Sequence, residues 1–323
     1  GHTGFKGSWL TLWLSKLGSK VFGISLSPKD SPNLFHLSDI NSSTQESHFV
    51  DIRDFNMLSS KIKEIQPEIA FHLAAQPLVL ESYKNPLETF SSNVQGTANL
   101  LESLREVDRI KSIVLITTDK VYKNVDHNFP YREIDTLGGH DPYSASKAAS
   151  EIVIASYNDS FFSQKGVSVA SARAGNVLGG GDWSSNRLIP DAIRAWSVNK
   201  PLIIRNPQSI RPWQHVLEPL AGYMRLAECL FKDQGFSGSY NFGPNENESA
   251  SVNDVLNLAI RYFGQGEILY EPSSENLYES KSLTLDITKS RDELGVKSRW
   301  SLSKSIRKTI DWYKLQLQGK NAK

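Results

Sequence analysis

The feature that most constrains the fold is the alternation of short apolar segments with amphipathic ones over the first 175 residues. Continuous apolar runs predict strands over 19–26, 48–54, 68–75, 111–118 and 167–175. Helical spacing of apolar residues predicts helices over 92–107 and 141–161, the second with Pro142 near its start. Apolar strands that alternate with helices are typical of an α/β protein with a doubly wound parallel sheet.

The last third departs from this rhythm. Helices are predicted near 187–198, 217–231, 252–263 and 301–317, separated by polar loops and short strands. We therefore predict a first domain over 1–175 and, over 176–323, mainly a smaller mixed α/β lobe, with some segments returning to the first domain.

Composition excludes several function classes. The formal net charge of +1 provides no field that would attract nucleic acid or lipid. No apolar run approaches the roughly 20 residues of a membrane span. Cys229 is the only cysteine, so there is no internal disulfide, which fits a cytoplasmic protein. The seven histidines show no metal-binding spacing, and we expect no metal site.

A glycine triplet, Gly1, Gly4 and Gly7, comes directly before a helical segment. Such a turn lets backbone N–H groups approach a pyrophosphate at the helix N-terminus. The spacing is G-x-x-G-x-x-G rather than the usual G-x-G-x-x-G, so a plain glycine-rich turn remains an alternative. The second predicted strand ends in "SLS" without an acid or arginine, and therefore does not separate NAD from NADP.

Two further motifs carry polar groups. "TTDKVY" places Thr118, Asp119 and Lys120 at the end of an apolar strand. Tyr143 and Lys147 are four residues apart, so they face the same side of one helix. An ammonium beside a phenol is expected to lower the pKa of Tyr143 and make it a candidate base, although an isolated pair of this kind is also common on helix surfaces.

Together these motifs resemble the extended short-chain dehydrogenases/reductases, which have a Rossmann-type fold. The blocks "GHTGFKGSWL", "FHLAAQPLV", "DPYSASKAASE", "ARAGNVLGGGDW" and "IRNPQSIRPWQHVLEPL" look like the CDP-glucose 4,6-dehydratase branch. The resemblance runs from Gly1 to about Gly243 and returns over 286–300, while "YES" at 278–280 departs from the expected pattern. It also implies a central strand before Gly1, so we expect a fragment that lacks this first strand and folds poorly.

The resemblance implies conversion of CDP-D-glucose to CDP-4-dehydro-6-deoxy-D-glucose and water. C4 of the sugar would be oxidised with NAD, water eliminated across C5 and C6, and hydride returned to C6. It also implies a cytoplasmic homodimer built from the helices near 92–107 and 141–161. The product would be a deoxysugar precursor of the kind used in lipopolysaccharide O-antigen biosynthesis.

Residue roles follow from the same resemblance. Tyr143 would take the 4-hydroxyl proton, Lys147 would hold the nicotinamide ribose, and Thr118 would bond the 4-oxygen. Asp119 and Lys120 would serve as acid and base of the elimination, which requires a protonated Asp119 and a neutral Lys120. Adjacent opposite charges favour the reverse state, whereas burial disfavours both charges. A structural ion pair is the alternative.

The remaining expected site residues fall into two groups. The first, expected around NAD with Tyr143 and Lys147, is Gly1, Thr3, Gly4, Phe5, Lys6, Gly7, Ser25, Asp51, Ile52, Leu73, Ala74, Ala75 and Gln76. The second, expected around the nucleotide sugar, is Asn176, Arg187, Leu188, Arg205, Arg211 and Gln214. Guanidinium groups suit diphosphate oxygens, although each arginine alone is also typical of a solvated surface.

Three other functions remain open. One is the dehydration of a different sugar nucleotide. A sugar-nucleotide epimerase would share the cofactor site and the Tyr143–Lys147 pair but would not need Asp119 and Lys120. A non-catalytic NAD-binding regulator is a more distant alternative, and the retained Thr118, Tyr143 and Lys147 argue against it.

Overall fold

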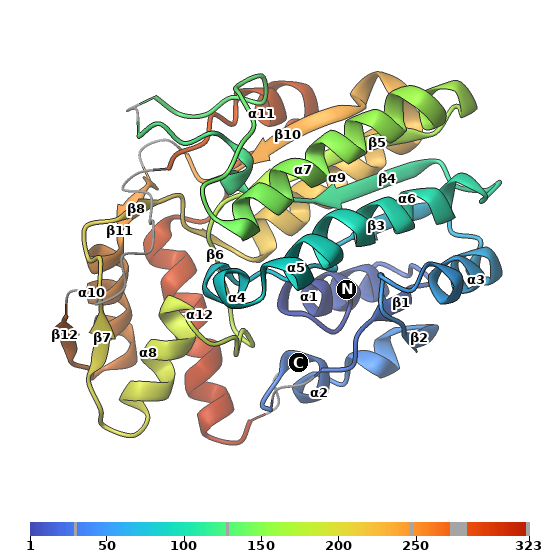
Figure 1. Ribbon diagram of the computed structural model, residues 1–323. Helices are drawn as coiled ribbons and strands as arrows, with labels where there is room; N and C mark the ends of the chain where they lie inside the picture. Colours follow the sequence, from blue (N-terminus) through green and yellow to red (C-terminus); the bar gives the residue numbers. More distant parts are fainter. Residues whose placement is uncertain (29–30, 127–128, 246–247, 272–282, 321–323) are drawn as a thin grey trace.

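The centre of the molecule is a four-stranded parallel sheet, seen in a computed structural model that describes residues 1–28, 31–126, 129–245, 248–271 and 283–320. Its order is β10 (Gly238–Phe242), β5 (Ser168–Ala174), β4 (Ser112–Ile116) and β3 (Ile69–His72). In the register, Val114 of β4 lies between Ala170 of β5 and Phe71 of β3. Helices lie in front of this sheet and behind it (Figure 1). The predicted α/β class with a parallel sheet is confirmed.

Strand β4 explains the layering. All five of its residues are buried, and successive side chains of a strand point to opposite faces. Ile113 and Leu115 pack under α3 (Phe55–Ile65), α6 (Gly96–Arg105) and α7 (Pro142–Tyr157). Val114 and Ile116 pack on the other face, in the cluster that holds α1 (Phe5–Lys16), α9 (Leu217–Lys232) and α11 (Thr288–Leu294). A strand that is apolar on both sides is stable only between two helical layers.

A second parallel pair, β1 (Phe22–Ser25) with β2 (Glu46–Phe49), lies beyond β3 in Figure 1. Among the described residues it shares no ladder with β3. The strand predicted over 48–54 therefore begins earlier and ends at Phe49, and 51–54 lead into α3. Between β1 and β2 lies the short helix α2 (Leu34–Leu37).

Strand β10 is the main element that the sequence analysis does not predict. Its sequence "GSYNF" alternates polar and aromatic residues, the pattern of a half-exposed strand. Asn241 is nevertheless fully buried, because its amide donates to the carbonyls of Tyr131 and Asp286 and its oxygen accepts from Tyr122. These partners come from distant segments, so no local pattern identifies them.

The smaller lobe is built around a third apolar cluster. It holds α8 (Leu188–Trp196), α10 (Val252–Phe263) and α12 (Leu302–Leu317), close to the helices predicted there. Its strands form two-stranded pairs: β7 (Leu202–Ile204) with β12 (Ile268–Tyr270), β8 (Ile210–Arg211) with β11 (Ala250–Ser251), and β6 (Val177–Leu178) with β9 (Gln214–His215). The segment 278–280 lies outside the described residues.

One buried ion pair joins the sheet to α7. The guanidinium of Arg173 in β5 is 2.8 Å from the carboxylate of Glu151, and each side chain is at most 4% exposed. Glu151 also accepts from Thr117 at 2.5 Å and from Ser171 at 2.7 Å. Burial disfavours the carboxylate, but Arg173 and these hydrogen bonds outweigh it and hold the pKa of Glu151 below its ordinary value.

We expect Glu151→Ala to lower the free energy of unfolding by about 3–5 kcal/mol, because it leaves the Arg173 charge buried without its partner. Urea denaturation at pH 7 measures this change. The matched control is Glu228→Ala, which breaks exposed pairs with Arg225 and Lys232 and should cost at most about 1 kcal/mol. Equal losses in the two variants would show that the buried pair contributes no special stability.

Candidate active site

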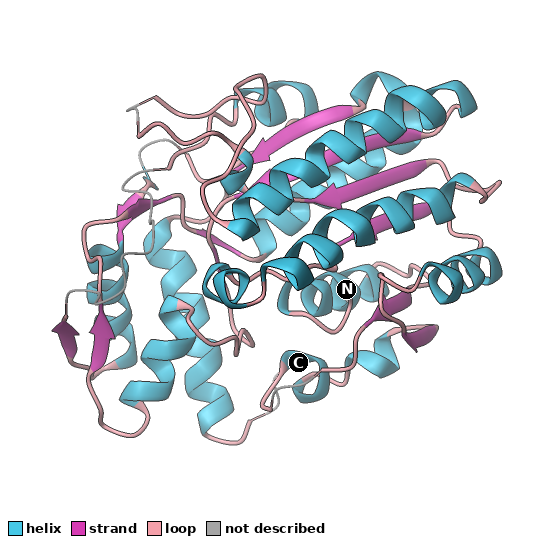
Figure 2. Cartoon of the chain, in the orientation of Figure 1, coloured by secondary structure: helices cyan, strands magenta, loops and turns pink. Residues whose placement is uncertain are grey.

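The candidate site lies where the strands of the sheet end. The arrows of β4 and β10 both point toward the smaller lobe (Figure 2). Strand β4 ends at Ile116, and the 3-10 turn η3 (Asp119–Val121) begins three residues later. The residues that follow β4 therefore lie at the carboxyl end of the sheet, on the side of the smaller lobe, which is where ligands bind in open α/β proteins.

Asp119 is the centre of a small polar cluster. It is fully buried, and its Oδ1 accepts from Thr118 Oγ1 at 2.9 Å and from Lys120 Nζ at 3.2 Å. Its Oδ2 is buried and has no hydrogen-bond partner among the described residues. Lys120 keeps about a third of its side chain exposed. The predicted neighbours thus form an ion pair, with one carboxylate oxygen left available.

Tyr143 reaches this cluster from the start of α7. Asp141 caps that helix by accepting from the Ser144 amide, and Pro142 occupies its first turn. The amide of Tyr143 donates to Ser82 Oγ at 3.1 Å, which fixes where the helix begins. The ring is 8% exposed, and interaction of its hydroxyl with Thr118 acts to lower its pKa.

The electrostatics of Tyr143 differ from the prediction. Burial raises its pKa to about 12, while the Thr118 hydrogen bond and the Arg187 charge act in the opposite direction. Lys147 Nζ instead donates to the Ile116 carbonyl at 3.1 Å, and burial lowers the pKa of this lysine to about 8. The expected lowering of the pKa of Tyr143 by Lys147 is therefore wrong for this arrangement, because desolvation dominates both groups.

At the glycine turn, backbone segments lie so close together that two of the glycines leave no room for a side chain. A Cβ at Gly1 would lie 2.6 Å from the Ala74 nitrogen, and one at Gly7 only 2.0 Å from the Gly1 oxygen. Gly4, the N-cap of α1, has no such contact and no side-chain cap, so the first N–H groups of α1 are open to an anion. Nearby, Thr3 Oγ1 and Ser25 Oγ are 2.7 Å apart.

The other predicted cofactor positions follow the ends of β3 and β2, which belong to different sheets. Leu73, Ala74, Ala75 and Gln76 follow β3, and Asp51 and Ile52 follow β2. The Asp51 carboxylate accepts from the Arg53 guanidinium through both oxygens. Phe5, at the first position of α1, packs against the cluster under α9.

Asn93 is a residue that the sequence analysis missed. Its side chain accepts from the Gln76 amide at 2.8 Å and donates to Ser146 Oγ at 2.8 Å, so it joins the loop after β3 to α7. The Gln76 side chain bonds Thr89 and Leu78. Asparagine is an unusual residue inside a helix, and this is the only feature of the sequence that could have indicated the role of Asn93.

The predicted substrate residues separate into two groups. The Arg187 guanidinium lies 3.6 Å from the Asp182 carboxylate, and its charge acts to lower the pKa of both Tyr143 and Lys6. Leu188 begins α8 directly after it. Arg211 is buried and donates to the Ile210 carbonyl. Arg205 is exposed on the lobe, beyond β7.

The other two predicted substrate positions make hydrogen bonds with backbone groups. Gln214 is buried, and its side chain donates to the Phe242 carbonyl at 2.9 Å. The Asn176 carbonyl accepts from the Gln214 amide, so that the turn after β5 is tied to β9.

Among the described residues no group of three or more His, Cys, Asp or Glu side chains is arranged to hold a metal ion. The described helices are too short or too polar to cross a membrane.

Lys6 brings a further cation to this site from the glycine turn. Burial lowers its pKa to about 7, and the charges of Arg187 and Lys147 act in the same direction, whereas Asp119 opposes them. Its Nζ lies 6.0 Å from the centre of the Tyr223 ring.

We predict a pH dependence of stability from Lys6. Between about pH 7 and pH 10 the unfolded chain binds a proton at Lys6 that the folded protein lacks, so stability rises with pH. Lys6→Met should remove up to about 1.4 kcal/mol per pH unit from this slope. Urea denaturation from pH 7 to pH 9 tests it, with the exposed Lys123→Met as control. Parallel slopes in Lys6→Met and the parent would refute the prediction.

Sequence comparison connects this geometry to known proteins. The model of the family described as GDP-mannose 4,6 dehydratase matches residues 1–309. The CDP-glucose 4,6-dehydratase of Salmonella typhimurium is 45% identical over 327 residues, which cover 99% of this chain and 91% of that protein. The dTDP-glucose 4,6-dehydratase of Streptomyces antibioticus is 28% identical, over 82% of this chain and 75% of that protein.

Solved structures agree on the fold. The UDP-glucose 4-epimerase of Thermotoga maritima has a TM-score of 0.85 at 20% identity and covers 98% of both chains. The dTDP-glucose 4,6-dehydratase of Bacillus anthracis, in complex with NAD, has a TM-score of 0.83 at 21% identity, covering 99% of this chain and 96% of that one. The chain therefore belongs to the GDP-mannose 4,6 dehydratase family, within the extended short-chain dehydrogenases/reductases.

Proposed function

We propose that this protein is an NAD-dependent hydro-lyase that converts CDP-D-glucose to CDP-4-dehydro-6-deoxy-D-glucose and water. The observation that carries the proposal is the ion pair of the buried Asp119 with the partly exposed Lys120, beside Thr118 and after the carboxyl end of β4. The Salmonella typhimurium relative, 45% identical over nearly the whole chain, is a CDP-glucose 4,6-dehydratase and supports the choice of substrate.

The residues around the glycine turn fit NAD. Side chains at Gly1 and Gly7 would fill the backbone cradle, and the uncapped N-terminus of α1 suits a pyrophosphate. Lys147, held at the Ile116 carbonyl, would bond the nicotinamide ribose. Bound NAD would supply the acceptor and the donor for the hydride. Solved relatives in this fold carry NAD, which supports the assignment.

For oxidation at C4, Tyr143 would accept the proton of the 4-hydroxyl while Thr118 orients that oxygen. Because the pKa of the Tyr143 phenol is about 12, only a small fraction of the protein carries an ionised Tyr143 at neutral pH. The ionised form is a strong base and can accept the proton. The nearby Arg187 charge favours the ionised form. Burial keeps water away from both groups.

For the elimination, Asp119 would protonate the departing 6-hydroxyl and Lys120 would remove the C5 proton. The new C4 ketone acidifies that proton. Asp119 Oδ2 has no partner among the described residues and is therefore available to the sugar. Lys120 needs a neutral form for this role, and a proton moved from Lys120 to Asp119 within their ion pair would provide both required states at once.

The nucleotide diphosphate would bind between the sheet and the lobe. Arg187 is the described guanidinium that faces the site most directly, and its fork suits phosphate oxygens. Arg211 lies farther along the lobe, where its burial suits a pocket wall. Arg205 is exposed on the lobe, where it would have to turn toward the diphosphate to bind it.

We further propose a homodimer that forms through the helices on the α7 side of the sheet. Leu87 and Phe90 of α5 (Pro86–Phe90) and Ile152 of α7 are exposed, by 84%, 39% and 63%. These helices lie on one side of the sheet in Figure 1, with α4 (Val79–Lys84) beside them. A surface with several exposed apolar side chains is typical of a protein interface. We place such an enzyme in the cytoplasm, where its nucleotide-sugar substrates are made.

A nucleotide-sugar epimerase is the second candidate, since the fold also occurs in the Thermotoga maritima epimerase. Incubation with CDP-, dTDP-, UDP- and GDP-hexoses separates the two functions by the mass of the product. We expect loss of one water from CDP-glucose, with slower or no reaction of the others. A product of unchanged mass would favour epimerisation and overturn the proposal.

A second test addresses the elimination. We expect Lys120→Ala to retain C4 oxidation but to slow solvent deuterium entry at C5 by roughly 100-fold or more, the usual contribution of a general base. Single-turnover experiments in D₂O would follow both steps. The matched control, Lys123→Ala, removes an exposed lysine from the same loop and should leave both steps unchanged. Normal deuterium entry in Lys120→Ala would remove Lys120 from the base role.

A further inference from the structure

Thr117 is a buried residue whose hydroxyl has no part in the proposed reaction steps. It directly follows β4, and its Oγ1 donates to Glu151 Oε1 at 2.5 Å. Glu151 belongs to α7, the helix that covers Ile113 and Leu115, so Thr117 continues the alternation of side chains along β4. Valine has a similar shape and suits a buried strand, so packing alone does not account for a hydroxyl here.

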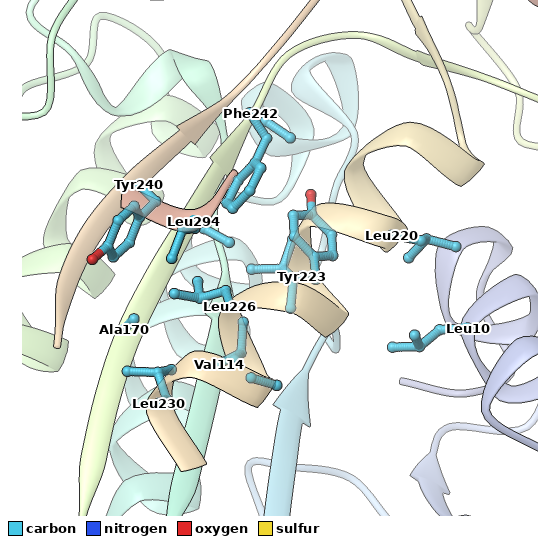
Figure 3. Close-up of a cluster of buried hydrophobic side chains, with 14 of the residues drawn as sticks. Leu10, Val114, Ala170, Leu220, Tyr223, Leu226, Leu230, Tyr240, Phe242 and Leu294 are labelled. Carbon is cyan, nitrogen blue, oxygen red and sulfur yellow. The ribbon is translucent and has the colours of Figure 1, made fainter. Parts of the chain in front are cut away.

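The contacts of β4 on its other face have no comparable direction. Figure 3 shows Val114 in one apolar cluster with Leu226 and Leu230 of α9. Apolar contacts stabilise the fold but are not directional. A short hydrogen bond to a carboxylate, by contrast, defines both a distance and an angle. The hydrogen bond of Thr117 therefore constrains the carboxyl end of β4 in a way that the apolar contacts do not.

Helix α7 makes two polar contacts with this strand end, one helical turn apart. Lys147 Nζ donates to the Ile116 carbonyl at 3.1 Å, and Glu151 accepts from Thr117. Four residues advance a helix by about 6 Å, so the two contacts hold α7 at separate points along its axis. Lys147 has three N–H donors, so the position of the Ile116 carbonyl decides where its other two donors point.

The hydrogen bond of Thr117 lies directly before the residues that we propose to react. The Thr117 amide donates to the Ala172 carbonyl of β5 at 3.0 Å, and η3 begins two residues later. The next side chains bond one another: Asp119 Oδ1 accepts from Thr118 Oγ1 and from Lys120 Nζ. A displacement of Thr117 would therefore move this group as a whole.

Glu151 does not require the Thr117 hydroxyl to compensate its charge. Its Oε2 accepts from Arg173 at 2.8 Å and from Ser171 at 2.7 Å. The buried ion pair thus remains when Thr117 is replaced. What the chain would lose is the hydrogen bond between α7 and the strand end.

We propose that Thr117 is a positioning residue for the oxidation at C4: its hydrogen bond to Glu151 fixes the end of β4 against α7. The strand end carries Thr118, and α7 carries Tyr143 and Lys147, so this bond sets how the three side chains meet the substrate. Reaction rates depend steeply on such placement, and an error of about 1 Å costs roughly 100-fold. The inference rests on the proposed dehydratase function.

Two substitutions at Thr117 separate the hydroxyl from its packing. Thr117→Val keeps the shape and loses the hydrogen bond, whereas Thr117→Ser keeps the hydrogen bond and loses a methyl group. In single turnovers of the full chain with CDP-glucose, followed by nicotinamide absorbance, we expect Thr117→Val to slow C4 oxidation roughly tenfold. Half-saturation by CDP-glucose should stay within about twofold, since no substrate contact is removed. Thr117→Ser should keep the rate of the parent within about twofold.

The matched control is Ser171→Ala. It removes another buried hydroxyl from the same Glu151 carboxylate, but Ser171 lies within β5 and not at the end of β4. We expect its oxidation rate to equal that of the parent. If Thr117→Val does not fold, Thr117→Cys replaces it with the same expectation, because a thiol is only a weak donor.

Two results would overturn the proposal. One is an equal rate of C4 oxidation in Thr117→Val and Ser171→Ala. The other is a rate that falls as far in Thr117→Ser as in Thr117→Val, which would indicate that the methyl group and its packing matter rather than the hydrogen bond.

NAD binding without a sugar nucleotide separates this inference from the proposed function. Because Lys147 would bond the nicotinamide ribose, we expect Thr117→Val to weaken NAD binding roughly fivefold by calorimetry, about the value of one hydrogen bond. Thr117→Ser and Ser171→Ala should bind NAD like the parent. If the parent dehydrates no nucleotide hexose but this pattern holds, the proposed function fails and the positioning role stands; without the pattern, both fail. If the parent dehydrates CDP-glucose and Thr117→Val oxidises it normally, only the positioning role fails.

Discussion

The Glu151 carboxylate is the group on which the arrangement of the site depends. It accepts from Thr117 at the end of β4, from Ser171 in β5 and from the buried Arg173 guanidinium. Arg173 in turn donates to the Tyr122 hydroxyl, which follows η3. One buried charge pair therefore sets the strand end, the 3-10 turn and α7 relative to each other. Because an unpaired buried charge is costly, this network tolerates little displacement.

The groups that we propose to react lie directly beside that network. Thr118 is next to Thr117 in the chain, and Lys147 is one helical turn before Glu151. Burial holds the reacting side chains in one geometry and also shifts their proton affinities, raising the pKa of Tyr143 and lowering that of Lys147. The same dry surroundings that oppose charge in the resting protein strengthen every electrostatic contact with a bound substrate.

The fold does not by itself choose between dehydration and epimerisation. A UDP-glucose 4-epimerase and a dTDP-glucose 4,6-dehydratase superpose on this chain about equally well. Under the proposed function, the difference resides in side chains at one strand end, where Asp119 and Lys120 would carry out the elimination.

The sequence by itself determined the layers, most strand positions and the polar groups after β4. Continuous apolar strands require two covering layers, and parallel strands bring their carboxyl ends to one edge. It did not reveal β10, Asn93 or the Glu151–Arg173 pair, because their partners lie 17 or more residues away. Nor did helical spacing predict the pKa of Tyr143. Only the tertiary structure decided these points, because hydrogen-bond partners and desolvation depend on which distant segments close over a side chain.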